Sequence, residues 1–478
     1  MLFNSVDFAI FLPVVFILYW FVTNKNLRLQ NVLILVASYL FYGWWDWRFL
    51  SLIFFSSIVD YMVGVNLAKA EHVAKRKRLL LISIIVNLGF LGFFKYYNFF
   101  VDSFVDAFVV FGQQINPARL NIILPVGISF YTFQTLSYSI DVYKRKLEPT
   151  KDVIAFFAFV SFFPQLVAGP IERAKSLLPQ FYKKREFNFD NAIEGLRQIL
   201  WGLFKKVVIA DSCAIYVNEV FGNYEMYNGA SLWLAIMFFA VQVYGDFSGY
   251  SDIAIGTAKL FGFSLMRNFA FPYFARDLGE LWQRWHISLT TWFRDYLFTP
   301  LLGTRRTRLK IYYAMVITFT VSGFWHGANW TFVIWGFLNG VIYVPYVVFR
   351  KKKKTRIIAQ GKFFPSVKEL LQMISTFMIF CVLGVFFRSV DIRHAFKYIT
   401  GMFNLSVFQV PENLPVNTIL ITFVFFLTEW IYRDKQFALE GLNISIKTKP
   451  LRWSVYFLVT VFIFIHSSNS QEFVYFQF

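Results

Sequence analysis

Apolar segments recur along almost the whole chain, from residue 8 to residue 467, with no long polar stretch between them. Inside a bilayer the backbone N–H and C=O groups find no water, so a chain of this kind must satisfy them within its own secondary structure. Hydrophobic residues make up 57% of the sequence and charged residues 16%, which is far from the balance of a soluble protein. We predict an all-α, polytopic integral membrane protein that forms a single domain over residues 1–478.

The apolar segments vary in length, and several are too short to cross a bilayer. We expect roughly 11 to 13 spanning, tilted and re-entrant helices. The segment at 8–22 is predicted to be a retained span, because Met1 to Asp7 carries no basic residue and no cleavage site follows, unlike a signal peptide. The remaining segments lie near 32–43, 48–68, 79–97, 120–140, 153–170, 195–211, 230–245, 311–325, 330–349, 371–387, 417–432 and 453–467.

The net charge of +19 is distributed in short basic clusters beside the apolar segments. This pattern is typical of cytoplasmic loops under the positive-inside rule, and it gives no reason to expect a nucleic-acid partner. It places the N-terminus outside, with the tryptophans of the 44–47 turn at the outer interface. A competing interpretation makes two of the clusters, 75–78 and 350–354, contacts for anionic lipid. The clusters are Lys25 with Arg28, Lys75 to Arg78, Lys144 to Lys146, Lys183 to Arg185, and Arg350 to Lys354.

His326 is one of only five histidines, and it lies between two strongly apolar segments. An ionisable side chain inside a membrane is costly to bury, so it is a candidate functional residue. The segment is interpreted as a packed helix that continues past His326, with Asn329 on the same side, and Gly323 with Gly327 would allow another helix to approach closely. The alternative is a histidine that only hydrogen-bonds between packed helices.

Charged and aromatic residues interleave between residues 274 and 303, and five large apolar residues recur there at three- and four-residue steps. These are Trp282, Trp285, Leu289, Trp292 and Tyr296. The spacing predicts one amphipathic helix along or dipping into the interface, with Glu280 and Arg284 paired on it. His286 either reaches from this helix toward the interface or lines a path to His326.

Other polar groups in apolar surroundings carry weaker signals. The run 244–252 contains Asp246 and Tyr250, which either line a tunnel or mark a polar break between two helices. Cys213 and Cys381 lack metal-ligand spacing and are expected to be packing residues, so we expect no metal site.

Five motifs together resemble the membrane-bound O-acyltransferase (MBOAT) family, in particular its bacterial branch that acetylates alginate, peptidoglycan and other polysaccharides. The chain ends, Met1 to Ser5 and Phe473 to Phe478, resemble the same branch. The motifs are Leu124 to Phe133, Phe163 to Ile171, Tyr244 to Asp252, Trp285 to Leu289 with Arg294-Asp295-Tyr296, and Gly323 to Gly327.

The resemblance implies helices around a central funnel, with the motif-bearing core at about 120–340. His326 matches the catalytic histidine of the family and His286 matches its second histidine. Imidazole suits this chemistry, because acyl transfer from a thioester needs a base with a pKa near neutrality. Further expected donor-tunnel residues are Trp325, Asn329, Ser288, Arg294, Asp295, Asp246 and Tyr250.

The expected function is transfer of an acyl group, acetyl above all, from a cytoplasmic thioester to an exopolysaccharide or cell-wall glycan. The resemblance implies acetyl-CoA as donor substrate, no bound cofactor, a periplasmic or extracellular partner protein, contact with membrane lipid, and a location in the bacterial inner membrane. The alternatives are D-alanyl or other acyl transfer to an envelope polymer, a non-catalytic membrane scaffold, and a transporter.

Overall fold

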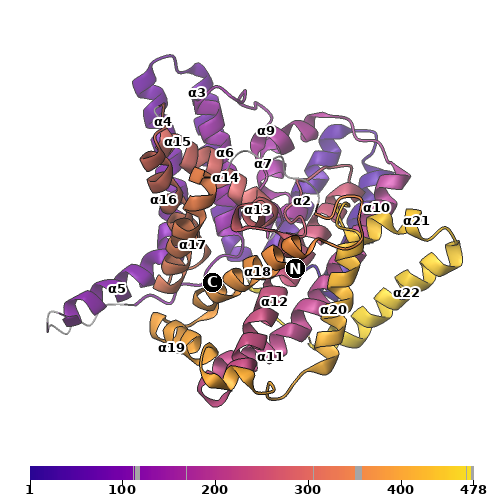
Figure 1. The fold of residues 1–478 in the computed structure, drawn as a ribbon. Coiled ribbons are helices and arrows are strands. Elements are labelled where there is room, and N and C mark those ends of the chain that lie inside the picture. Colours follow the sequence, from indigo (N-terminus) through magenta and orange to yellow (C-terminus); the bar gives the residue numbers. More distant parts are fainter. Residues whose placement is uncertain are drawn as a thin grey trace. The chain divides into compact units, whose positions relative to one another are not determined.

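The computed structural model describes residues 1–110, 112, 119–167, 169–304, 306–349, 358–469 and 471–474. Within these residues every regular element is a helix (Figure 1), which confirms the all-α prediction. The chain divides into two compact units, one of residues 1–195 with 257–266 and the other of residues 196–256 with 267–478. The expectation of a single domain stays a prediction.

The first unit contains the N-terminal helices, several of which run on into short π or 3-10 turns. They are α1 Val6–Ile17, α2 Leu27–Asp46, α3 Leu50–Lys69, α4 Val73–Leu91, α5 Tyr97–Val110, α6 Ile128–Tyr143, α7 Val153–Ser161, α8 Phe163–Leu166, α9 Ala174–Leu177 and the start of α10 Phe189–Leu203.

The second unit contains the rest of α10, the π-helix η5 Phe204–Ala210 that continues it, and most of α12. Its other helices are α11 Asp211–Gly222, α12 Gly229–Leu260, α13 Leu278–Arg284, α14 Ile287–Phe293, α15 Thr299–Leu302, α16 Arg308–His326, α17 Trp330–Phe349, α18 Val367–Arg388, α19 Ile392–Met402, α20 Val416–Ile431, α21 Leu442–Ser445 and α22 Lys449–His466.

Four helical stretches in the described residues are long and apolar enough to cross a membrane. They are Leu27–Lys69, Val73–Val109, Gly229–Leu260 and Val367–Arg388. The first stretch contains α2 and α3, joined by the short turn Trp47–Phe49, and Trp44 and Trp47 are exposed near this turn. Shorter apolar helices accompany these stretches, at Val6–Val22, Val153–Leu166 and Val416–Ile431.

Two predicted segments are interrupted in the structure. The segment at 120–140 becomes helical only at Ile128, because Pro125 lacks an N–H and Gly127 adopts a left-handed φ of 76°. The segment at 153–170 is broken at Phe162, between α7 and α8.

The possible polar break at 244–252 is wrong, because α12 runs through this segment without interruption. Buried cations compensate both of its aspartates: Lys206 Nζ lies 2.9 Å from Asp246 Oδ1, and Lys205 Nζ lies 2.5 Å from Asp252 Oδ2. Paired charges of this kind can be buried within a helix bundle, so the chain need not leave the helix to hydrate them.

Within the first unit, Arg76 of the 75–78 basic cluster is buried. Its guanidinium donates hydrogen bonds to the carbonyl oxygen of Leu67 at 2.6 Å, near the end of α3, and to that of Tyr143 at 2.8 Å, at the end of α6. The carbonyls at a helix C-terminus favour a cation. This arginine therefore joins helix ends within the protein, and the lipid contact of the 75–78 cluster stays a prediction. The 350–354 cluster lies outside the described residues.

Helices α16 and α17 form a hairpin in the second unit whose backbones approach closely at two glycines. A Cβ atom added at Gly323 would lie 2.2 Å from the carbonyl oxygen of Phe332 and 3.0 Å from Cα of Gly336. The close approach expected at Gly323 is thus confirmed. Gly327 instead lies beyond the end of α16, facing the Phe332 ring. His326 is the last residue of α16, so the packing of Gly323 and Gly327 against α17 fixes the position of His326.

We expect Gly323→Ala to destabilise the protein by about 1–3 kcal/mol, since the added methyl group must push two backbones apart. Thermal unfolding of purified protein in detergent measures the effect. Gly89→Ala is the matched control, because nothing lies within 4 Å of a Cβ at this helical position, and alanine favours a helix over glycine. Equal unfolding temperatures for the two variants would contradict the close-packing argument.

Candidate functional site

His286 occupies a sharp turn between two short helices. Helix α13 begins after Asp277, whose side chain accepts a hydrogen bond from the N–H of Glu280 at 2.8 Å, and it ends at Arg284. His286 has a left-handed φ of 43°, and α14 begins at the next residue. The predicted continuous helix through Trp282 and Tyr296 is therefore wrong. A non-glycine residue with positive φ is strained, so surrounding contacts must hold the turn.

The segment 268–270 supplies those contacts. The N–H of Ile287 donates to the carbonyl oxygen of Asn268 at 2.8 Å, and the N–H of Ala270 donates to that of Arg284 at 2.9 Å. The side-chain oxygen of Asn268 also lies 3.1 Å from Nδ1 of His286. The contacts with residues 268–270 therefore fix the orientation of the His286 imidazole, and neither α13 nor α14 determines it alone.

His326 is buried at the C-terminal end of α16. Its ring packs edge-on against Trp335 of α17 and Phe387 of α18, with centroid distances of 5.4 Å in both cases. The centroids of the His326 and His286 rings are 6.4 Å apart. Two histidines that are 40 positions apart in the sequence therefore face one site, as the motifs predicted.

Both histidines line a cavity of about 500 Å³, which we call the large cavity. Its wall is mostly aromatic, and its polar lining includes Gln283, Thr290, Thr291, Arg294 and Ser322. Largely apolar cavities with a few converging polar groups are typical of small-molecule sites. The large cavity is the candidate substrate site of the second unit.

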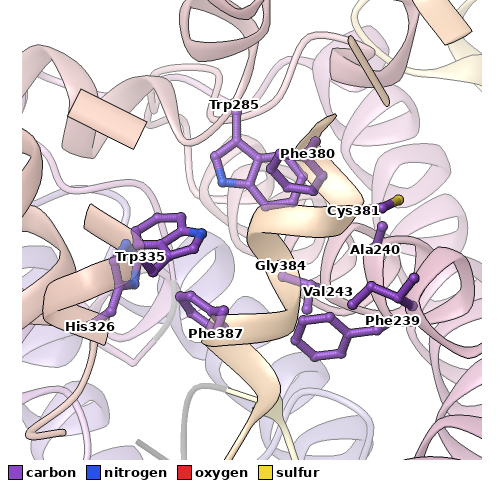
Figure 2. A pocket seen from close by; sticks show the side chains of 11 residues that line it. Phe239, Ala240, Val243, Trp285, His326, Trp335, Phe380, Cys381, Gly384 and Phe387 are labelled. Atoms are coloured by element: carbon purple, nitrogen blue, oxygen red, sulfur yellow. The ribbon is translucent and has the colours of Figure 1, made fainter. Parts of the chain in front are cut away.

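A second cavity of about 30 Å³, the small cavity, adjoins His326 (Figure 2). Its lining is apolar, and α18 contributes Phe380, Cys381, Gly384 and Phe387. Helix α12 contributes further apolar side chains, namely Ile236, Phe239, Ala240 and Val243. Trp285, His326 and Trp335 line both cavities. His326 is therefore accessible from two sides, one with polar groups and the other apolar.

The charges around the turn are balanced inside the protein. Glu280 has a fully buried side chain and forms ion pairs with Arg284 at 2.7 Å and Arg276 at 3.0 Å, which confirms the predicted Glu280–Arg284 pair. Burial raises the pKa of Glu280, but the two arginines outweigh it and lower the pKa below its usual value. Burial, and secondarily the neighbouring His326, lower the pKa of His286 well below its usual range. His286 is therefore neutral at physiological pH.

The other predicted site residues are distributed unevenly. Arg294 lines the large cavity with the two histidines, and it pairs with Asp295 at 2.8 Å. Ser288 and Trp325 adjoin His286, with Ser288 Oγ 3.4 Å from Nδ1 and the Trp325 ring centroid 6.3 Å from that of the imidazole. These residues gather at one site although the predicted helix does not exist.

Three predicted tunnel residues lie elsewhere in the second unit, outside the lining of both cavities. Helix α16 ends at His326, so Asn329 does not share a helix face with it; Asn329 donates to the carbonyl oxygen of Val390 at 2.9 Å. Asp246 accepts from the N–H of Val474 at 2.7 Å. Tyr250 packs on Phe473 with centroids 4.2 Å apart.

The motifs did not identify Asn268 or Trp335 as site residues. Asn268 precedes the His286 motif by 18 positions, and Trp335 follows His326 by nine, with no periodic relation to either histidine. Only the folded chain brings Trp335 to the wall of both cavities and Asn268 into contact with His286. Within the described residues no group of three or more His, Cys, Asp or Glu side chains is arranged to hold a metal ion.

The fold and the site define a class of protein, namely a helical membrane protein with two histidines at one largely apolar cavity. The chain belongs to the membrane-bound O-acyltransferase family, whose sequence model matches residues 40–387. It is thus a multi-pass membrane protein and an acyltransferase.

Several bacterial proteins are similar in sequence to this chain. A probable alginate O-acetylase AlgI of Pseudomonas putida is 35% identical, and the similarity covers 99% of both proteins. A peptidoglycan O-acetyltransferase of Helicobacter pylori is 31% identical over 100% of this chain and 98% of its own length. A teichoic acid D-alanyltransferase of Bacillus subtilis is 27% identical over 55% of this chain and 68% of its own length.

Proposed function

We propose that this acyltransferase transfers an acetyl group from acetyl-CoA, on the cytoplasmic side of a bacterial inner membrane, for O-acetylation of a secreted or cell-wall glycan. The observation that carries the proposal is the position of His326, on the wall shared by the large cavity and the small cavity. The named activities of the alginate and peptidoglycan relatives support an acetyl group and a glycan acceptor.

His326 is the proposed general base, or the residue that transiently carries the acyl group, and His286 assists it. As base, His326 takes the proton from an attacking hydroxyl or thiol. The oxygen or sulfur then forms a bond to the thioester carbonyl carbon, the carbon–sulfur bond of the donor breaks, and the proton passes to the departing thiolate. Holding both reactants in one cavity converts the transfer into an effectively unimolecular step.

The donor's acyl group is proposed to enter the small cavity. Its volume of about 30 Å³ is close to that of a single methyl-sized group. The apolar lining matches the methyl end of acetyl, whereas the ammonium group of D-alanyl would be buried there without a partner. This favours acetyl over the D-alanyl alternative.

Phe239→Ala is expected to enlarge the small cavity, so that butyryl transfer rises at least about tenfold relative to acetyl transfer, because one fewer ring then limits the acyl chain. The measurement compares labelled acetyl-CoA, butyryl-CoA and a D-alanyl thioester with membranes that contain the protein. Phe238→Ala is the control, since Phe238 is similarly buried but outside the lining. If wild-type protein transfers D-alanyl in preference to acetyl, the proposed donor is wrong.

The transferred group is proposed to reach its glycan through a periplasmic or extracellular partner protein. The aromatic lining of the large cavity suits a thioester and one small nucleophile, and its volume of about 500 Å³ is too small for a polymer chain with several sugars. Co-purification of an envelope acetyltransferase with this protein, and loss of glycan O-acetyl groups when either gene is deleted, would support this route.

A further inference from the structure

Asn268 is fully buried beside His286, and both its side-chain amide and its backbone carbonyl have hydrogen-bond partners. Its carbonyl oxygen accepts from the N–H of Ile287 at 2.8 Å. Its side-chain NH₂ group donates to Ser251 Oγ at 3.0 Å, and its side-chain oxygen faces Ser288 Oγ at 2.9 Å and His286 Nδ1 at 3.1 Å. These partners leave the amide a single orientation.

The identity of the side-chain oxygen follows from its neighbours. The backbone N–H of Ser288, which can only donate, points to this atom at 3.3 Å. The atom is therefore the amide oxygen and not the nitrogen. An amide oxygen only accepts hydrogen bonds, so Nδ1 of His286 at 3.1 Å must carry a hydrogen. The Ser288 hydroxyl does not replace this hydrogen, because it lies closer to the amide oxygen than to Nδ1, 2.9 Å against 3.4 Å.

We propose that Asn268 is a positioning residue that holds His286 as the neutral tautomer with its hydrogen on Nδ1, so that Nε2 presents a lone pair to the reaction. This inference rests on the proposed function, in which the two histidines act on a thioester and its acceptor. The Nδ1–H tautomer limits the chemical roles that His286 can take. Without a hydrogen, Nε2 cannot donate to the thioester carbonyl oxygen, so His286 acts as a hydrogen-bond or proton acceptor.

The surroundings of the turn agree with a neutral imidazole. The titratable or charged groups that line the large cavity with His286 are His326, Arg294 and Tyr343. None of them carries a negative charge that would stabilise an imidazolium, and burial disfavours the charged form further. On the other side of Asn268, a polar cavity of about 10 Å³ is lined by Lys205, Asp252, Arg267 and Glu429. Asn268 also lines this cavity, whereas His286 does not.

Asn268→Asp and Asn268→Ala test the proposal through the pH dependence of kcat/KM for acetyl transfer. A carboxylate in place of the amide keeps the hydrogen bond and stabilises the imidazolium. We expect Asn268→Asp to raise the pKa of His286 and to move the acidic limb of the pH profile upward by about one pH unit. Asn268→Ala removes the acceptor, and kcat is expected to fall at least about tenfold with little change in KM for acetyl-CoA.

Asn31 provides the matched control for both substitutions. It is also buried, it accepts from Arg185 at 2.6 Å, and it belongs to the first unit. Asn31→Asp and Asn31→Ala should leave the acidic limb in place. An Asn268→Asp profile that superimposes on the wild-type profile, or a wild-type kcat for Asn268→Ala, would overturn the proposal. If His286→Ala and His326→Ala also retain full activity, the proposed function itself fails, not only the role of Asn268.

Discussion

His326→Ala is expected to lower acetyl transfer from acetyl-CoA by at least about 100-fold, because a positioned general base contributes about 10²–10⁴ to the rate. The ring lies on the wall between the two cavities, so alanine also joins them. His326→Gln separates these effects, since glutamine fills similar space but is not basic near neutrality. We expect a comparable loss for both variants, measured as labelled acetyl incorporated per unit of membrane-inserted protein.

His466 provides the control for a general effect of losing a histidine. It is in the last turn of α22, where Nδ1 lies 2.9 Å from the carbonyl oxygen of Phe462 in the same helix. His466→Ala should transfer acetyl at the wild-type rate. Wild-type transfer by His326→Gln at equal expression would remove His326 from the chemistry, whereas loss only in His326→Ala would assign it a space-filling role.

Lys206→Met is expected to destabilise the second unit by about 3–5 kcal/mol, because it removes the cation from a buried group of charges. The side chain is 2% exposed, and Nζ lies 2.7 Å from Asp211 Oδ1 and 2.9 Å from Asp246 Oδ1. Nζ also donates to the carbonyl oxygen of Gln471 at 2.9 Å. Methionine would leave two carboxylates buried without a counter-ion. Unfolding in mixed detergent micelles, followed by circular dichroism, measures the loss.

Two variants make this prediction specific. Lys206→Met combined with Asp211→Asn and Asp246→Asn removes all three charges, and we expect it to regain most of the lost stability. Lys397→Met removes an exposed cation whose partner is Glu225 at 2.9 Å, and solvent screens surface pairs of this kind so that they contribute little to stability. A Lys206→Met variant as stable as Lys397→Met would contradict the argument.

Local patterns predicted the helices better than they predicted where the helices stop. The apolar segments all contain helix, because buried backbone groups in a membrane protein leave few alternatives. At His286 and after His326 the three- and four-residue steps continue through positions where the chain turns. The turn at His286 depends on Asn268, which is distant in sequence, so no periodicity within 274–303 could reveal it.

The sequence identified which polar residues lie in apolar surroundings, but it did not reveal what each of them does in the folded protein. Asp246 appeared as a tunnel candidate because an aspartate in an apolar run is costly. Its partner Lys206 lies 40 positions earlier, and the two meet only when η5 packs near α12. The sequence therefore indicated that a buried aspartate must have a partner or a function. The structure places Asp246 in an ion-pair group with Lys206 and Asp211, and this group also binds residues 471–474 of the C-terminal segment.

The sequence by itself determined that the chain is a helical membrane protein and that it carries the acyltransferase motifs, and it singled out two histidines as the candidate catalytic residues. Composition and short motifs record these properties, since solvation and local chemistry act on neighbouring residues. Only the tertiary structure decided that the two rings lie 6.4 Å apart, that His326 lies between a large and a small cavity, and that Asn268 holds His286. Those properties arise from contacts between segments far apart in the chain, and the spacing of residues along one segment does not encode them.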